Sequence, residues 1–249
     1  GWMSEQEAQD GHDIIEWIAE QPWCDGNVGM VGISYFGTVQ LVVAAQQPPH
    51  LKAIMPWNAP ADFYRESTHH GGMLQTFFHY LYIQRICADN SISVTAKEKS
   101  KEELRKLVDE LKADPDLKIN PELFTYVDNP GKAPCLFDIL ANPEDGPYWW
   151  ELAVDRYHDQ IETPIYHLGG WFDIFLAGTL KNYTGLRQRA RSETARRAQR
   201  LIIGPWIHGS GNTIVTKAGE IDFGPEAARN INELRLPWFD HLLKGMDTG

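Results

Sequence analysis

Continuous apolar runs occur at four places in the chain, and each is short enough to be a buried strand. They comprise residues 28–33, 52–57, 163–168 and 200–204. Segments with the composition of helices separate most of these runs. Strands that are apolar throughout and alternate with helices are typical of parallel sheets with both faces covered. The pattern therefore predicts an α/β fold built on a parallel sheet.

Three segments beside these strands have the spacing of helices. Residues 10–21 place large apolar side chains on one side, and a proline follows them. Residues 38–46 are apolar and stop before a pair of prolines. Residues 225–244 form the last predicted helix, which is interrupted at Pro237.

The pattern changes between about residues 61 and 160. A charged segment at 97–113 has apolar residues at helical spacing: Leu104, Leu107, Val108 and Leu111. An aromatic cluster precedes it: Phe77, Phe78, Tyr80 and Tyr82. We interpret this part as a helical cap inserted over the strand ends. The predicted organisation is a first core segment (1–60), the cap (61–160) and a second core segment (161–249).

Composition narrows the classes of partner. The 249 residues are 43% hydrophobic and have a net charge of −11, as expected for a soluble globular protein and not for one that mainly binds nucleic acid. An arginine-rich stretch at 187–200 could bind an anion, although a solvated face leading into the last strand explains it more simply. No apolar run of about 18 residues indicates a membrane span, and no secretory signal is visible.

The three cysteines are Cys24, Cys87 and Cys135, and they lack the close spacing of a metal site. Scattered cysteines favour reduced thiols in a cytoplasmic protein over a disulfide framework, and we therefore expect a cytoplasmic location. An odd count does not exclude one bridge.

The first predicted strand ends at a serine between glycines, in the run Gly32-Ile-Ser34-Tyr35-Phe36-Gly37. A strand that breaks at such a serine and leads into a helix is typical of a nucleophile elbow, the sharp turn that exposes a serine hydroxyl above a sheet. An isolated run of this kind is more often a simple strand-to-loop turn.

Two further ionisable residues follow strand-like runs. Asp173 lies just after the third strand, and His208 follows the fourth. The order Ser, Asp, His along the chain is that of elbow-containing hydrolases, and open α/β sheets place their chemistry at the carboxyl ends of strands. Taken singly, Asp173 could be a helix-cap residue and His208 a packed surface histidine.

The three residues together predict a Ser34–His208–Asp173 catalytic triad. Ser34 would attack a carbonyl carbon, His208 would accept and return the proton, and Asp173 would orient the imidazole. The backbone N–H of Tyr35 would be one oxyanion donor. One feature departs from the general elbow, because the second glycine stands at position 37 and Phe36 takes its usual place.

The narrower pattern Gly-x-Ser-Tyr-x-Gly is similar to the elbow of the CocE/NonD family of serine hydrolases, relatives of the X-Pro dipeptidyl-peptidases. Three other motifs share the resemblance: residues 21–29 before the elbow, Gly170-Trp-Phe-Asp173, and Gly204-Pro-Trp-Ile-His208. The resemblance implies an α/β-hydrolase core, an inserted helical cap, and ester or amide hydrolysis through an acyl-enzyme, with no cofactor.

The strands that precede the elbow in that family have no counterpart in this sequence. An α/β-hydrolase normally has several strands before the elbow, whereas this chain reaches the elbow in its first predicted strand. The family also has an upstream tyrosine as second oxyanion donor and a carboxyl-terminal jelly-roll domain, and no residues here match them. We therefore expect a fragment, or a chain completed by further strands or by a homo-oligomer.

Aromatic residues surround the predicted triad. We predict that Trp171 and Phe175 line an apolar acyl pocket, with core packing as the alternative. Glu144 and Asp145 could hold a substrate ammonium group, although a solvated turn explains them more simply.

The histidines His69, His70 and His79 suggest a metal site, but no further ligands at suitable spacing accompany them. We interpret them as surface residues of the cap and predict no metal.

The sequence thus predicts a serine hydrolase acting on a small ester or amide, with no nucleic acid or membrane partner. An X-Pro dipeptidyl-peptidase or acylase on the same machinery is an alternative. So is a non-catalytic binding module that keeps the fold.

Overall fold

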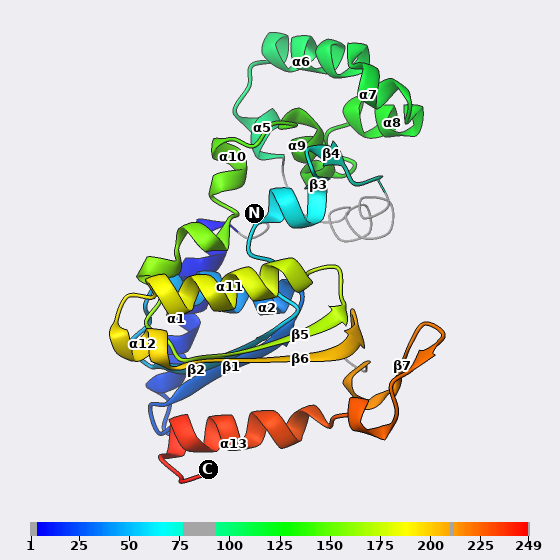
Figure 1. The fold of residues 1–249 in the computed structure, drawn as a ribbon. Helices are drawn as coiled ribbons and strands as arrows, with labels where there is room; N and C mark the ends of the chain where they lie inside the picture. Colours follow the sequence, from blue (N-terminus) through cyan, green and yellow to red (C-terminus); the bar gives the residue numbers. More distant parts are fainter. Residues whose placement is uncertain (1–3, 77–92, 210–211, 249) are drawn as a thin grey trace. The chain divides into compact units, whose positions relative to one another are not determined.

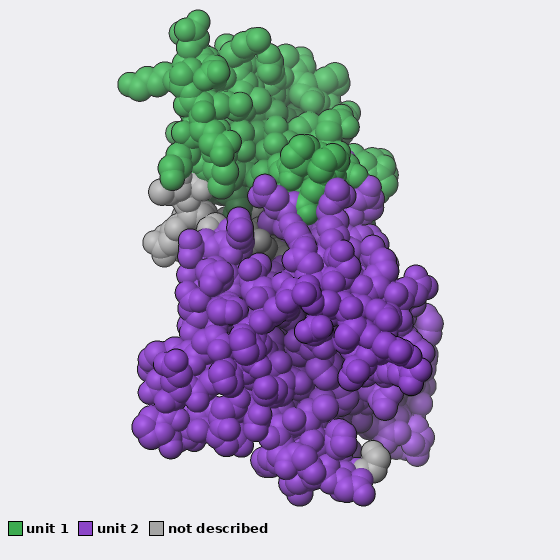
Figure 2. All heavy atoms as spheres, turned by 90° about the vertical axis from the view of Figure 1, so that its left-hand side faces the viewer, with its two compact units in different colours: residues 1–2, 67–150 green, residues 3–66, 151–249 purple. Residues whose placement is uncertain are grey.

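The computed structural model describes residues 4–76, 93–209 and 212–248 (Figure 1). The chain divides into two compact units, which Figure 2 shows in different colours. We call Met3–Glu66 with Glu151–Gly249 the sheet unit, and Ser67–Trp150 the helical unit. The three-segment organisation with boundaries at 60/61 and 160/161 stays a prediction.

The sheet unit contains four parallel strands in the order β1-β2-β5-β6. Their bounds are β1 (Val28–Ile33), β2 (Leu51–Trp57), β5 (Ile165–Phe172) and β6 (Gln199–Ile207). These are the four predicted strands, and the predicted α/β class with a parallel sheet is confirmed. Among the described residues, β1 and β6 are the outer strands of this sheet.

Helices cover both faces of the sheet, which is why its strands are apolar throughout (Figure 1). One face packs against α1 (Glu5–Ala19), α2 (Tyr35–Ala45) and α11 (Leu176–Arg189), and the other against α13 (Ile231–Lys244). The short helix α12 (Glu193–Arg197) packs against α11. Fully buried Leu41 and Val43 of α2 pack with Ile54 and Ile165 of the sheet to form the core.

Capping residues account for the helix starts that the sequence pattern placed wrongly. Helix α1 begins at Glu5, five residues before the predicted start, because the side chain of Ser4 accepts from the backbone N–H of Glu7. The last helix begins at Ile231, after an Asn230 cap, and its proline lies inside it at Pro237.

Short elements complete the sheet unit. They are η1 (Tyr64–Thr68, which runs into the helical unit), η4 (Val154–Arg156), η5 (His158–Gln160), η6 (Asn212–Ile214), β7 (Lys217–Ala218), β8 (Ile221–Asp222) and η7 (Pro225–Ala227). Strands β7 and β8 form a small antiparallel hairpin after the end of β6.

The helical unit contains one longer helix, α6 (Lys101–Ala113), which lies inside the helix predicted at 97–113, and several short elements. Its elements are β3 (His69–His70), β4 (Met73–Leu74), α5 (Val94–Lys97), α6, α7 (Pro115–Lys118), η3 (Pro121–Leu123), α8 (Phe124–Val127), α9 (Pro134–Ala141) and α10 (Pro147–Trp150). A capping box between Ser100 and Glu103 starts α6. The aromatic cluster at 77–82 lies outside the described residues.

The expectation of reduced thiols is wrong for Cys135, which is disulfide-bonded. Cys24 is free, and Cys87 lies outside the described residues. Disulfides persist mainly in oxidising compartments, and the cytoplasmic location stays a prediction. Within the part of the chain that the structure describes, no helix is long and apolar enough to cross a membrane.

Candidate active site

Ser34 occupies the turn between β1 and α2 in a conformation that few residues adopt. Its backbone has φ +61° and ψ −123°, a region in which a side chain is strained. Such a conformation persists only where the surrounding structure holds it in place. Three groups of contacts do so here.

Backbone hydrogen bonds connect the turn to the neighbouring strand and to its own helix. The N–H of Ser34 donates to the carbonyl of Trp57 at the end of β2, at 2.8 Å. The carbonyl of Ser34 accepts from the N–H groups of Gly37 and Thr38, both at 2.9 Å. The turn is therefore fastened at both ends of the serine.

The second glycine of the elbow is explained by a close approach of α2 to β2. A Cβ atom at Gly37 would lie 2.9 Å from the carbonyl oxygen of Trp57, closer than real side chains come. Phe36, in contrast, is exposed. The chain thus needs its glycine three residues after the serine, which accounts for the departure from the general elbow pattern.

Gln40 is a residue of this site that sequence analysis missed. Its buried side chain donates from Nε2 to the carbonyls of Phe36 (2.8 Å) and Gly32 (3.2 Å). Its Oε1 accepts from the N–H of Met55 at 3.1 Å. One side chain thereby joins the end of β1, the first turn of α2 and the middle of β2.

Asp173 follows the end of β5 and is held by its own loop. Its N–H donates to the carbonyl of Gly170 at 3.1 Å, and its Oδ1 accepts from the N–H of Phe175 at 2.7 Å. The side chain has no solvent exposure. The remaining oxygen, Oδ2, faces His208.

His208 lies just after β6 and bridges the other two residues. Its Nδ1 is 2.7 Å from Oδ2 of Asp173, and its Nε2 is 3.0 Å from Oγ of Ser34. Because a carboxylate oxygen only accepts, Nδ1 bears a proton, and Nε2 of the neutral ring can then accept from the serine hydroxyl. The side chain of His208 is 31% exposed, so part of the imidazole is open to solvent, whereas the Asp173 side chain is not.

The predicted oxyanion donor, Tyr35, is the first residue of α2. Backbone N–H groups in the first turn of a helix have no partner inside that helix and point out from its positive end. Its phenol donates a hydrogen bond to Oε1 of Glu7 in α1.

The chain is similar to known proteins along a stretch that includes Ser34, Asp173 and His208. Residues 1–210 match the family model described as X-Pro dipeptidyl-peptidase (S15 family). The chain belongs to this family. Cocaine esterase of Rhodococcus sp. (strain MB1 Bresler) is 27% identical to it over 243 residues, which is 95% of this chain and 40% of that protein.

Solved structures agree on the fold of this S15 family member. A CocE/NonD family hydrolase from Staphylococcus aureus superimposes with a TM-score of 0.63 at 26% identity, covering 99% of this chain and 34% of the other. An aminopeptidase from a marine sediment Thaumarchaeota archaeon gives a TM-score of 0.71 at 20% identity, covering 98% and 39%. The resemblance to CocE/NonD hydrolases and the partial α/β-hydrolase fold are thereby confirmed.

This member of the family spans about 40% of the length of the curated relatives that it matches along most of its residues. The relatives' printed names describe esterases and peptidases. The family is thus one of hydrolases, and any reaction of this chain is a matter for proposal.

The two residues predicted for an acyl pocket occupy different environments. Trp171 is 60% exposed at the end of β5, whereas Phe175 is 3% exposed. The Phe175 ring meets the imidazole of His208 edge-on, with ring centres 5.4 Å apart. A lining role for either side chain stays a prediction, and Phe175 also supports His208 directly.

Other candidates lie in the helical unit, which we describe by itself. Asp145 accepts from the indole N–H of Trp150 at 3.1 Å. The prediction that His69 is a surface residue is wrong: it is buried, and its ring packs edge-on against Trp149. Burial lowers the pKa of His69 to about 4.

His70 is exposed, and His79 lies outside the described residues. Among the residues that the structure describes, no three His, Cys, Asp or Glu side chains come together as metal ligands.

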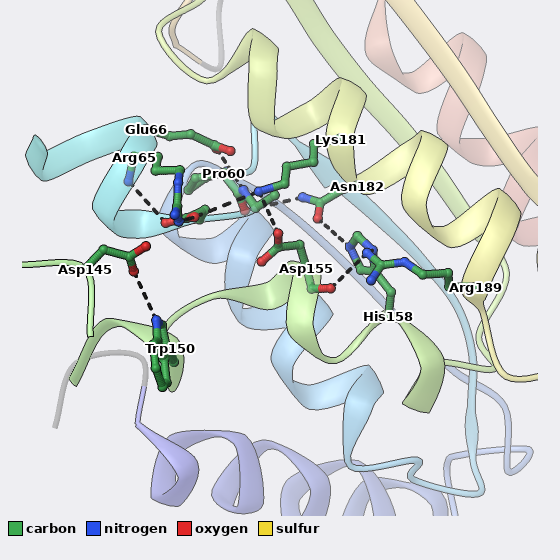
Figure 3. A network of polar contacts seen from close by, with 12 residues as sticks. Pro60, Arg65, Glu66, Asp145, Trp150, Asp155, His158, Lys181, Asn182 and Arg189 are labelled. Carbon is green, nitrogen blue, oxygen red and sulfur yellow. Dashed lines mark hydrogen bonds and ion pairs between the residues drawn. The ribbon is translucent and has the colours of Figure 1, made fainter. Parts of the chain in front are cut away.

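A buried polar network fastens α11, the helix that follows Asp173 (Figure 3). The amide of Asn182 donates to the carbonyls of Ala59 (3.4 Å) and Pro60 (3.3 Å). Its Oδ1 accepts from Nε2 of His158 at 3.0 Å, and Nδ1 of that ring accepts from Arg189 at 3.0 Å. Burial lowers the pKa of His158, which suits the neutral ring that these contacts require.

Glu66, a residue of η1, lies near the first turns of α11 (Figure 3). Its Oε2 accepts from the N–H of Ala61 at 2.9 Å, and burial raises the pKa of its carboxyl to about 7. Lys181 nearby forms an ion pair with Asp155 at 2.6 Å. The contacts of Asn182 join α11 to the loop after β2, and the Lys181 ion pair joins it to η4; no local sequence signal predicts them.

Proposed function

We propose that this chain cleaves an ester or amide bond through an acyl-enzyme formed on Ser34. The observation that supports the proposal most directly is the position of the His208 ring. It lies 3.0 Å from the Ser34 hydroxyl on one side and 2.7 Å from the Asp173 carboxylate on the other. This arrangement activates a serine, which is otherwise a weak nucleophile.

In the first half-reaction, Oγ of Ser34 attacks the substrate carbonyl carbon while Nε2 of His208 takes the hydroxyl proton. The negative charge that develops on the carbonyl oxygen is stabilised by the N–H of Tyr35 at the start of α2. His208 then gives the proton to the leaving alcohol or amine. The bond to the leaving group breaks, and the acyl group stays on Ser34.

In the second half-reaction, water takes the place of the leaving group. His208 accepts a proton from the water, the hydroxide adds to the acyl carbon, and Oγ of Ser34 leaves with the returned proton. The products are a carboxylic acid and the free enzyme. Asp173 supports the positive imidazolium in both halves, and its burial keeps water from competing for that contact.

For the substrate we propose a small ester or amide with an apolar acyl group. In support, the buried ring of Phe175 packs edge-on against His208, and Trp171, two residues before Asp173, has an exposed side chain at the end of β5. Ester cleavage is favoured by the similarity to cocaine esterase along 95% of the chain.

Peptide or amide cleavage is the second candidate function. It is favoured by the match of residues 1–210 to the X-Pro dipeptidyl-peptidase model. The same three residues would act, with an amine as leaving group. A carboxylate placed to hold the substrate's ammonium group would distinguish this activity from ester cleavage.

Labelling with a fluorophosphonate, followed by mass spectrometry, tests the proposal against a non-catalytic binding module. We expect an adduct on Ser34 in the purified chain and none in a His208→Ala variant that melts at the same temperature. A folded chain that gives no adduct contradicts the proposal. Screening the unlabelled chain on aryl esters and on X-Pro amides then separates the two candidate functions.

A further inference from the structure

Helix α1 lies close against α2, the helix that begins at the elbow. A Cβ atom at Gly11 of α1 would lie 2.4 Å from Cγ2 of Val43, so the two helices approach more closely than a side chain at position 11 would allow. Ala8 and Ile15, at helical spacing around Gly11, are both buried. The backbone of α1 is therefore held firmly against α2.

Glu7 is placed in the first turn of α1 by the cap of that helix. Its backbone N–H donates to Oγ of Ser4 at 3.3 Å. The side chain is half-buried, and its position relative to α2 follows from the packing around Gly11. Glu7 is thus a fixed acceptor beside the start of α2.

Tyr35 connects this acceptor to the nucleophile. It follows Ser34 directly, and its phenol donates to Oε1 of Glu7 across 28 positions of sequence. The same residue contributes the backbone N–H that the proposed function assigns to the oxyanion. A side-chain hydrogen bond to α1 therefore restrains the residue whose backbone must point at the reacting oxygen.

We propose that Glu7 is a positioning residue for the reaction, acting through the phenol of Tyr35. This inference rests on the proposed function. The restraint matters because Ser34 has a strained backbone, so the peptide that joins it to Tyr35 would relax if its surroundings allowed. A hydrogen-bond donor stabilises an oxyanion most when it already points at it, because no free energy is then spent on turning the donor during the reaction.

Breaking the Glu7–Tyr35 hydrogen bond should lower kcat, but by less than removing an oxyanion donor altogether. Removal of one oxyanion donor costs about 10²–10³ in rate, whereas loosening a donor that remains present costs less. We expect Glu7→Ala and Tyr35→Phe each to lower kcat on an aryl ester by about tenfold, with KM changed less than about twofold. Glu7→Gln keeps an oxygen that accepts from the phenol, and it should retain most of the activity.

The double variant gives the sharpest test. If Glu7 acts through Tyr35, the Glu7→Ala/Tyr35→Phe chain loses about as much as either single variant, since both remove one hydrogen bond. Glu5→Ala is the matched control, because it removes another acidic side chain from the same helical turn. Its kcat should equal that of the wild type.

Three outcomes would overturn the inference. They are losses that multiply in the double variant, a Glu7→Ala effect equal to that of Glu5→Ala, and a fall in melting temperature with unchanged kcat. Failure of the proposed function is distinguishable from these outcomes. In that case the wild-type chain itself would give no Ser34 adduct with the fluorophosphonate, before any variant is compared.

Discussion

The backbone N–H of Phe175 donates to Oδ1 of Asp173 at 2.7 Å, which leaves Oδ2 for Nδ1 of His208. The two oxygens of one buried carboxylate thus have separate partners on opposite sides. This arrangement sets the direction of the carboxylate before any substrate binds.

Asp173→Asn is expected to abolish most activity while keeping the fold. An amide can still accept from Phe175, but an NH₂ group facing Nδ1 stabilises the wrong tautomer of His208. We expect kcat on an aryl ester to fall by about 10⁴-fold, with a melting temperature within a few degrees of wild type. A variant that keeps more than a tenth of wild-type kcat would remove Asp173 from the proposed triad.

Gln40→Leu is expected to destabilise the sheet unit. The change leaves the buried N–H of Met55 without the acceptor that Gln40 provides and removes one donor from two carbonyls. Such losses cost about 1–3 kcal/mol for each unsatisfied buried group, so we expect a loss of roughly 2–4 kcal/mol in urea unfolding. The control is Gln9→Leu, at an exposed position of α1, which should change the free energy of unfolding by less than about 0.5 kcal/mol. Equal stabilities of the two variants would show that the Gln40 contacts contribute nothing.

Gly37→Ala is expected to disturb both stability and the elbow. The added methyl group would meet the carbonyl of Trp57, to which Ser34 donates its N–H. We expect a loss of about 1–3 kcal/mol and slower fluorophosphonate labelling of Ser34. Gly131→Ala is the matched control, because no atom lies within 4 Å of a Cβ there. Labelling of Gly37→Ala at the wild-type rate would contradict the close approach described here.

The pH dependence of the free energy of unfolding should show the raised pKa of Glu66. Burial raises the pKa of this carboxyl from 4.5 to about 7, so the folded chain keeps a proton that the unfolded chain releases between these values. Stability is therefore lost as pH rises through this range, while the neighbouring Lys181 cation limits the loss and Asp62 adds to it.

Glu66→Gln removes this titration and keeps an acceptor for the N–H of Ala61. Relative to wild type, we expect the variant to gain up to about 3 kcal/mol between pH 4.5 and pH 8, measured by urea unfolding at each pH. A constant difference across this range would mean that Glu66 titrates near its usual pKa.

Local pattern was sufficient to predict the four strands and to place Ser34, Asp173 and His208 at strand ends. Each of those predictions depends on the neighbours of a residue along the chain, which the sequence displays directly. Their catalytic roles stay a prediction until Ser34 is labelled. The same reasoning failed at the start of α1, because the capping serine at position 4 outweighs the apolar spacing that begins later.

The contacts that sequence could not reveal connect distant segments. Gln40 reaches β2, Glu7 reaches Tyr35, and Asn182 reaches Pro60, yet each looks like an ordinary polar residue in its own surroundings. The burial of His69 also depends on a partner far along the chain, Trp149. Polar residues in the core are recognisable only once the fold has placed their partners.

The pairing of β2 with β5, which aligns Ile54 with Ile165, joins positions more than a hundred residues apart. Such a connection closes slowly, because the entropy of a long loop must be overcome before any contact compensates for it. Until it closes, the hydroxyl at position 34 and the imidazole at position 208 belong to separate parts of the chain. On the proposed function, an unfolded chain would therefore not react with a fluorophosphonate at Ser34 until β2 and β5 have paired. Labelling of Ser34 would then report that the sheet has formed.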